Sequence, residues 1–298
     1  MQKALFIINP ISGGKKKDGV PEMIEKYLDQ ELFNPTIVFS DGVLHARQIA
    51  REAVNMFDVI VAVGGDGTVN EVASAMVHGK AVLGIIPYGS GNGLSRFLRI
   101  SMDAKKALEI LNAGRVETID TGRLNGQPFF NMAGMGFDAH ISEVFAHYKS
   151  RGLFTYIKSS MEEVAKYKPQ TYLLNIDGKE YSREAFMLSF ANSSQYGNNA
   201  HISPYASVQD GLLDICVIRK FPLWRFLEMG LRMLTKTAEG TSYVEILRGK
   251  HIHVKRENPG PVHIDGEPQI CGTEAQVDVI PNSLKVIVGK GFKTSHKS

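Results

Sequence analysis

Short apolar runs alternate with segments of helical spacing along the first part of the chain. Runs such as ALFIINP and DVIVAVGG have the length and composition of buried strands. Between such runs, apolar residues recur near every third or fourth position, which predicts helices over Val20–Leu32 and His45–Val54. The same reasoning predicts strands at TIVFS and AVLGIIP, and helices from about Asn70, from near Asn92 and over Ala104–Leu111. This order predicts a parallel α/β sheet with helices on both faces.

The pattern changes after about Thr121. Eight β-like segments follow: FFNMAGMGF, TYLLNID, EAFMLSFAN, LLDICVIR, EILRGKHIHVKR, PVHIDG, AQVDVI and LKVIVG. Turn signals such as IDGKEY, QYGNN, ENPGP and IPNS separate them. Two helices are predicted, around Phe154–Lys166 and over Leu223–Lys236. We therefore expect mostly antiparallel β-structure here and a domain boundary near residue 122.

Composition narrows the class of protein. A chain of 298 residues can form one large domain or two ordinary ones. The net charge is +3 and no basic stripe interleaved with aromatic residues appears, so nucleic acid is not an expected partner. No run approaches the ~20 apolar residues of a membrane span, and Asn9 and Pro10 end the first apolar run too early for a signal peptide. Cys216 and Cys271 form no CxxC pair, which suits a reducing, cytoplasmic setting.

Three glycine-containing loops follow predicted strands and precede predicted helices. They are NPISGGKKK from Asn9, GGDGTVNE from Gly64 and PYGSGNGLS from Pro87. In a parallel sheet all three lie at the carboxyl edge, where open α/β folds bind ligands. Glycine lets the backbone approach a phosphate, and Ser12, Thr68 and Ser90 offer hydroxyl donors. The alternatives are that each loop is only a turn and that the KKK run is solvated.

Asp66 is an acid among these glycines. It would repel a phosphate unless a cation lay between them, so it suggests Mg²⁺ carried with a nucleotide. The alternative is a turn aspartate that bonds its own backbone.

Two other nucleotide-binding motifs do not apply. The chain has no GxxxxGK[ST] motif, which excludes a P-loop. GMGFDA, at Gly134–Ala139, lies outside any βαβ unit and is interpreted as strand glycines that another backbone approaches closely.

These motifs together resemble the diacylglycerol kinase catalytic-domain family, which includes bacterial lipid kinases and sphingosine and ceramide kinases. The matching segments, in chain order, are NPISGG, GGDGTVNEV, PYGSGNGLSR, FFNMAGMGFDA, DGLLDICVI and HIDGEP. The resemblance implies an α/β nucleotide-binding domain over residues 1–122, completed by 287–298. It also implies a β-sandwich lipid-substrate domain over 123–286, with the active site in the cleft. GGDG alone is shared with NAD kinases.

Transferred motif by motif, the resemblance implies an ATP site. Its residues would be Asn9, Pro10, Ser12, Gly13, Ser40, Gly64, Gly65, Asp66, Gly67, Thr68, Asn70, Ser90, Asn92 and Asp120. Ser40 replaces a threonine of many bacterial relatives and keeps the hydroxyl. Gly93 replaces an acidic residue of those relatives, and the GSGN form is closer to sphingosine kinases, so the lipid stays open.

The resemblance implies two further sites in the β-rich half. A structural Mg²⁺ would be held by Asp210 and by backbone oxygens near Ser207 and Leu212, with a plain Asp-Gly turn as the alternative. Glu267 or Asp265 would accept the proton of the substrate hydroxyl, with Asp66 completing the catalytic set. The alternative for HIDGEP is a hairpin with exposed acids.

A lipid substrate requires contact with a bilayer. Leu223, Phe226, Leu227, Leu231 and Leu234 lie near one face of a predicted helix that also carries a tryptophan and basic residues, as in interfacial helices. A helix packed on the sandwich has the same pattern. His251 and His253 alternate on a strand and are interpreted as an exposed face rather than a metal site.

The sequence thus predicts an ATP- and Mg²⁺-dependent kinase of a diacylglycerol-like or sphingoid lipid, acting transiently at the inner face of the membrane. Two alternatives remain, a soluble-substrate kinase of the NAD-kinase type and a nucleotide-binding regulatory protein without turnover. Dimers are common among the relatives, which leaves a homodimer open.

Overall fold

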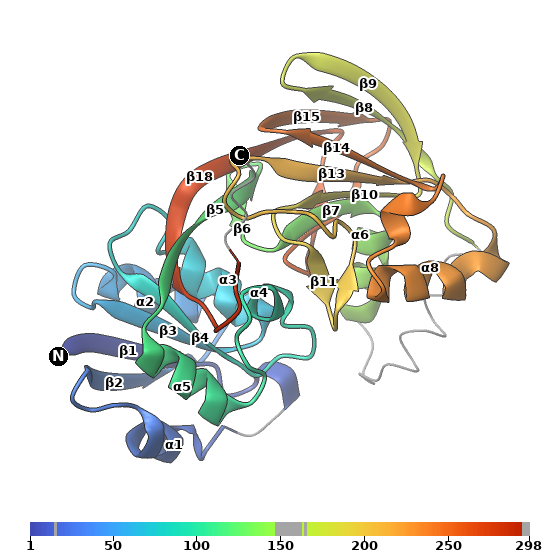
Figure 1. The fold of residues 1–298 in the computed structure, drawn as a ribbon. Coiled ribbons are helices and arrows are strands. Elements are labelled where there is room, and N and C mark those ends of the chain that lie inside the picture. The colour runs from blue at the N-terminus through green and yellow to red at the C-terminus, as the bar shows by residue number, and fades with distance from the viewer. Residues whose placement is uncertain (15–16, 147–162, 164–165, 294–298) are drawn as a thin grey trace. The chain divides into compact units, whose positions relative to one another are not determined.

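The computed structural model describes the chain except for residues 15–16, 147–162, 164–165 and 294–298 (Figure 1). It divides into two compact units. Unit 1 comprises residues 1–121, 208–210 and 281–298, and unit 2 comprises residues 122–207 and 211–280. The predicted helix around 154–166 lies almost wholly outside the described residues.

Unit 1 is built on a parallel sheet with the strand order β2-β1-β3-β4. Its central strands are almost wholly buried, as expected for a sheet covered on both faces. The end of β18 adds to the sheet in parallel beside β4, where Val286 pairs with Leu83. The bounds are β1 Gln2–Ile8, β2 Phe33–Phe39, β3 Val59–Gly64, β4 Val82–Pro87, β5 Val116–Leu124 and β18 Glu274–Ile287.

Helices cover both faces of this sheet. The helices α1 and α5 contact each other on one side, and α2 and α3 contact each other on the other (Figure 1). Each αβ connection is short, so every βα loop returns to the same edge of the sheet. The bounds are η1 Ser12–Gly14, α1 Val20–Tyr27, α2 His45–Ala53, α3 Asp66–Ser74, α4 Gly93–Phe97 and α5 Ala104–Ala113.

Unit 2 is an antiparallel β-sandwich. One sheet has the order β14-β13-β10-β7-β16-β17, and the other consists of β18, β15, β8 and β9. Apolar residues from the facing sides of both sheets form its main core. The bounds are β6 Gln127–Phe129, β7 Met132–Gly136, β8 Gln170–Ile176, β9 Lys179–Ala185, β10 Met187–Ala191, β13 Leu213–Ile218, β14 Val244–Gly249, β15 His251–Arg256, β16 Gly260–Ile264 and β17 Glu267–Cys271.

A second core lies on the outer face of the six-stranded sheet. Met187 and Cys216 from the strands pack there with Phe137 of α6 and Met229 of α8. The remaining elements are α6 Phe137–Ala146, the hairpin β11 Gln195–Gly197 and β12 Ala200–His201, η2 Leu223–Arg225, α8 Phe226–Leu234 and η3 Ala238–Gly240. Within the described residues, every helix is too short or too polar to cross a bilayer.

The predicted fold class is confirmed, but two predictions about strands are wrong and one strand was missed. EILRGKHIHVKR is not one strand: β14 ends at Gly249 and β15 begins at His251, in different sheets. No turn separates two strands at IPNS. The strand β18 continues through it, and only Asn282 has a left-handed backbone conformation there. The strand β5 was not predicted, because its alternating charged residues hide the buried stretch from Ile119 to Gly122.

Two helix boundaries also differ from prediction. The first helix ends at Tyr27 rather than Leu32, and the next residue is already extended. The helix predicted from about Asn70 begins at Asp66, directly after β3. The acid of the GGDG motif therefore lies in the first turn of a helix, whose N-terminal N–H groups open toward the loop edge.

Candidate functional site

The three glycine loops of unit 1 pack directly on one another. A Cβ at Gly13 would lie 1.8 Å from the carbonyl oxygen of Tyr88, and Gly13 has φ +67°. A Cβ at Gly89 would lie 2.7 Å from the Cα of Gly65. Backbone approaches this close leave no room for side chains, so glycine is required where the loops meet. The prediction that the loops share one edge of the sheet follows from the parallel order and is matched by these contacts.

Side-chain hydrogen bonds join the first two loops. The Nδ2 of Asn9 donates to the Oγ1 of Thr68 at 3.1 Å, and the Oδ1 of Asn9 accepts the N–H of Ile11 at 3.1 Å. The Oγ of Ser12 donates to the carbonyl oxygen of Asn9 at 3.3 Å. Ser40 is buried at the end of β2, and its N–H donates to Ile8. Asn9, Thr68 and Ser12 are thus held in fixed positions by the fold itself.

Asp66 connects the second loop to the third. Its Oδ2 accepts the N–H of Asn92 at 2.8 Å, and its Oδ1 accepts the N–H of Gly93 at 3.0 Å. These N–H groups stand at the start of α4, so the carboxylate caps that helix as an anion would. The alternative of a purely local turn aspartate is therefore wrong, since these bonds reach 26 and 27 residues along the chain.

Asn92 shapes the third loop. Its Oδ1 accepts the N–H of Gly89 at 3.0 Å, and its Nδ2 donates to the carbonyl oxygen of Gly89 at 2.7 Å. Asn92 itself is buried and has φ +51°, a conformation that asparagine adopts more readily than most residues. Ser90 stands exposed at the tip of the turn that these bonds close. The hydroxyl of Ser90 is accordingly accessible to a ligand.

Lys17 contradicts the expectation of a solvated KKK run. It is buried, its Nζ donates to the carbonyl oxygen of Ser12 at 2.5 Å, and it lies 5.3 Å from the centre of the Tyr88 ring. Lys15 and Lys16 lie outside the described residues. The ammonium of Lys17 therefore contacts both the first loop and the third.

Asp120 lies on β5 and is buried. Its Oδ1 accepts the N–H of Asn282 at 2.7 Å, and its own N–H donates to Val208 at 2.6 Å. The left-handed conformation of Asn282 aims that N–H at the carboxylate. Asp120 thus anchors two returning segments of unit 1, a role that sequence reasoning missed. Its predicted part in organising nucleotide remains a prediction.

The predicted metal loop forms an irregular turn before β13. Gly211 has φ +69° there, Ser207 is buried and Asp210 is exposed. The division into units falls within this loop, because Asp210 belongs to unit 1 while Ser207 and Leu212 belong to unit 2. In the described ranges no three His, Cys, Asp or Glu side chains converge as metal ligands. A site made of one carboxylate and carbonyl oxygens would not form such a cluster, so the loop stays a prediction.

The HIDGEP motif forms a tight hairpin between β16 and β17. Asp265 and Gly266 have φ +47° and +90°, and Ile264 pairs with Glu267 across the turn. The acids differ in environment. The carboxylate of Asp265 accepts the N–H groups of Phe130, Asn131 and Met132 at 3.0, 2.9 and 3.0 Å, whereas Glu267 is exposed. The alternative of a hairpin with exposed acids therefore holds for the hairpin and for Glu267, but not for the half-buried Asp265.

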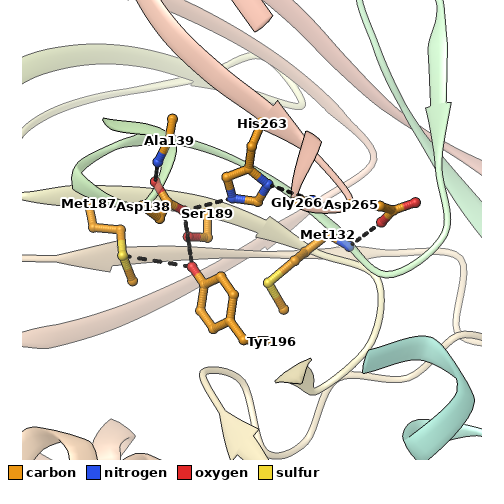
Figure 2. A network of polar contacts seen from close by, with 9 residues as sticks. All are labelled: Met132, Asp138, Ala139, Met187, Ser189, Tyr196, His263, Asp265 and Gly266. Carbon is orange, nitrogen blue, oxygen red and sulfur yellow. Dashed lines mark hydrogen bonds and ion pairs between the residues drawn. The ribbon is translucent and has the colours of Figure 1, made fainter. Parts of the chain in front are cut away.

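A buried polar network next to this hairpin was missed from the sequence (Figure 2). Asp138 and His263 form its centre, 3.0 Å apart between Oδ2 and Nε2. The interpretation of GMGFDA changes accordingly. It holds at Gly136, where a Cβ would lie 2.8 Å from the backbone oxygen of Phe186, but at Gly134 the space is filled by the side chains of Asp138 and His263. The sequence signal that could have found this network is the presence of Asp138 and His263 in two largely apolar segments, GMGFDA and PVHIDG.

Comparison with known proteins identifies the class. The profile of the diacylglycerol kinase catalytic domain matches residues 3–124, and that of the YegS C-terminal NAD kinase beta sandwich-like domain matches residues 131–288. The chain belongs to the diacylglycerol kinase family, as its motifs predict.

Individual relatives agree in sequence and in fold. A diacylglycerol kinase of Bacillus subtilis is 27% identical over 90% of both chains. The crystal structure of a diacylglycerol kinase from Bacillus anthracis superposes with a TM-score of 0.76, at 21% identity and 98% coverage of both chains. An NAD kinase from Archaeoglobus fulgidus in complex with ATP gives a TM-score of 0.55 at 16% identity, over 97% of this chain and 94% of that one. These two structures support the fold of both units.

Proposed function

We propose that this protein transfers the γ-phosphoryl group of ATP to the hydroxyl of a membrane lipid of the diacylglycerol or sphingoid kind. Membership of the diacylglycerol kinase family is the observation that carries the proposal. The packed glycine loops of unit 1 support it, because they have the features of a phosphate-binding edge.

The residues of unit 1 fit a nucleotide with its cation. The first turn of α3, residues 66–68, would direct N–H groups at phosphate oxygens, and the hydroxyls of Ser12, Thr68 and Ser90 would add donors. Asp66 would hold Mg²⁺ directly or through water, which suits an ion that binds one or two carboxylates and keeps several waters. When bound, Mg²⁺ would neutralise charge that develops on the phosphates. The ammonium of Lys17 contacts two of the same loops and adds to their positive potential.

On unit 2, Glu267 is the better base of the two acids. A general base needs a carboxylate that can reach the substrate proton. The oxygens of Asp265 already accept three backbone N–H groups, whereas Glu267 is exposed. We therefore assign the proton of the acceptor hydroxyl to Glu267 and a structural role to Asp265.

The outer face of α8 supports a lipid acceptor over a soluble one. We use this name for Leu223 and Trp224 of η2 together with Leu227, Leu231 and Leu234 of α8. Trp224 is 73% exposed, Leu227 66% and Leu231 61%. Phe226 instead packs against the second core, which corrects its predicted place on the outer face. Apolar residues that repeat along one exposed side of a helix are typical of segments that lie in a membrane interface.

The charge around this face complements an anionic bilayer. Residues 219–239 carry five Lys and Arg against two Glu, a net charge of +3. Glu228 is paired with Arg232 at 2.8 Å and Arg219 with Glu245, outside this range, at 3.0 Å, while Lys220 and Lys236 are exposed. Basic residues near a membrane surface attract anionic lipids by about 1 kcal/mol each. We therefore propose that the outer face of α8 rests on an anionic phospholipid surface.

A phosphotransfer assay tests the function. The protein would be incubated with ATP labelled at the γ-phosphate and Mg²⁺, together with mixed micelles of diacylglycerol, sphingosine, ceramide or no lipid, and with NAD as a soluble acceptor. Label in one lipid is expected and would name the acceptor. Label in NAD alone would move the assignment to a soluble-substrate kinase. ATP binding without any transfer would favour a regulatory protein.

A further inference from the structure

Three residues stand side by side on neighbouring strands of the six-stranded sheet. Gly134 of β7 pairs with Ser189 of β10 on one side and with His263 of β16 on the other. Residues paired in register point to the same face of a sheet, so Ser189 and His263 flank the empty position above Gly134. A Cβ there would lie 2.1 Å from the Oδ2 of Asp138 and 2.6 Å from the Nε2 of His263. Because Gly134 has no side chain, the carboxylate of Asp138 fits between Ser189 and His263.

The carboxylate of Asp138 accepts several hydrogen bonds above Gly134. Its Oδ2 accepts the hydroxyls of Ser189 at 2.9 Å and Tyr196 at 3.1 Å, and lies 3.0 Å from the Nε2 of His263 (Figure 2). Its Oδ1 accepts the N–H of Ala139 at 2.8 Å. Burial, and next the charge of Asp138, raise the pKa of Tyr196 well above its usual value. The phenol therefore stays protonated and donates.

This arrangement fixes the tautomer of His263. When the ring carries one proton, the contact with the carboxylate of Asp138 places that proton on Nε2 and leaves Nδ1 as an acceptor. The N–H of Gly266 points at Nδ1 across 3.4 Å, a long hydrogen bond that only the unprotonated nitrogen can accept. Gly266 is the second residue of the turn that ends at Glu267. The buried Asp138–His263 pair is thus connected to the exposed Glu267 by one hydrogen bond, which His263 accepts from the residue just before that acid.

We infer that the Asp138–His263 pair is a positioning device for Glu267. On one side of the turn, the carboxylate of Asp265 accepts three N–H groups at the start of β7, and on the other His263 accepts the N–H of Gly266. Glu267 follows directly, so its backbone is held from both sides. Reacting groups need to be fixed within about half an ångström of their productive geometry, which such supporting contacts provide.

Stability alone does not explain the pair. Removing the carboxylate of Asp138 and its polar partners from water is costly, and apolar residues of similar volume are often as stable or more so in such a place. The surroundings are apolar, since Met132, Met187 and Phe137 lie in the adjoining core. An acid, a histidine, a tyrosine and a serine that satisfy one another in that core are therefore better explained by a need for orientation. This inference rests on the proposed function, in which Glu267 is the base.

The tautomer can be measured without any activity. The ¹⁵N shifts of the His263 ring at pH 7, assigned with a His263→Gln sample, should show a neutral ring with its proton on Nε2. The amide of Gly266 should exchange more slowly with solvent in the parent than in the His263→Gln protein. A ring protonated on Nδ1, or on both nitrogens, would overturn the inference even if the protein is a lipid kinase.

A double-mutant cycle tests the action through Glu267. In the parent protein, His263→Gln should lower kcat for lipid phosphorylation about 10- to 100-fold, as loss of an orienting partner does, with the KM for ATP unchanged. In a Glu267→Gln background the same change should cost less than about 3-fold, because residues that act as a unit are not additive. An equal loss in both backgrounds, or none in the parent, would refute the inference.

Two further variants serve as controls. One tests whether a milder change in the network has a smaller effect, and the other tests whether replacing any histidine lowers kcat. Ser189→Ala removes one donor to Asp138 and keeps the pair, so a smaller loss of kcat that also vanishes with Glu267→Gln is expected. His253→Gln, on β15 of the other sheet, should leave kcat unchanged. If the parent protein labels no lipid, the proposed function fails, and the ring tautomer by itself then decides whether the pair holds the turn.

Discussion

The carboxylate of Asp66 accepts the backbone N–H of Asn92 at 2.8 Å, so the acid of the second glycine loop closes the third. A residue that sequence reasoning assigns to a cation also holds the backbone at the start of α4. A carboxylate has about four acceptor positions, so one group can serve both purposes. Any variant of Asp66 therefore changes loop geometry and charge together, and the two effects have to be separated.

Asp66→Asn separates them. The amide oxygen still accepts one of the two N–H groups, so we expect the free energy of unfolding to fall by no more than about 1 kcal/mol. Loss of the charge should lower kcat/KM for ATP at least about 100-fold, as loss of a group that stabilises transition-state charge does. Asp18→Asn, at an exposed acid near the first loop, is the control. Activity near the parent level in a folded Asp66→Asn protein would exclude the cation role.

Gly13 and Gly14 form a matched pair for the loop packing. Both have positive φ, +67° and +64°, but a Cβ at Gly14 meets no atom within 4 Å. Gly14→Ala should cost about 1 kcal/mol from backbone strain alone. Gly13→Ala adds a clash with the backbone of Tyr88, so we expect at least about 2 kcal/mol more in urea denaturation and a weaker affinity for ATP. Equal losses for the two variants would show that the contact between the loops is not formed.

The two acids of the hairpin should behave differently on substitution. Glu267→Gln should lower kcat about 100-fold or more and leave ATP affinity and the melting temperature unchanged, because the side chain is exposed. Asp265→Asn weakens a carboxylate that accepts three N–H groups, so we expect a loss of about 1–3 kcal/mol in stability. Calorimetry and lipid kinase assays on both variants check this. The reverse pattern would assign the base to Asp265.

The outer face of α8 should govern binding to membranes. The double variant Leu227→Glu/Leu231→Glu should reduce co-sedimentation with vesicles that contain 30% phosphatidylglycerol at least about 10-fold, through lost apolar burial and added negative charge. The control is Leu173→Glu on β8, where an apolar side chain is also exposed. The melting temperatures of all three proteins should be similar, since each site is exposed. Unchanged sedimentation of the double variant would exclude this face as the contact.

The sequence by itself determined the class of fold and the family. Buried strands such as Val59–Gly64 are continuous apolar runs, and glycine loops directly after them mark the carboxyl edge of a parallel sheet. These signals are local, because period, turn chemistry and motif spacing are properties of neighbouring residues. The same local signals placed His251 and His253 on one strand face, where the structure pairs His253 with Glu274.

Only the tertiary structure decided which polar groups meet. Asp66 with Asn92, Asp120 with Asn282 and Asp138 with His263 are separated by 26, 162 and 125 residues along the chain. No periodicity encodes such pairs, since each joins segments that are far apart in the chain and meet only on folding. The same holds for the outer face of α8, where packing against the second core turned Phe226 inward and left Trp224 exposed. A helical pattern defines an apolar side, but the partner surface decides which residues it covers.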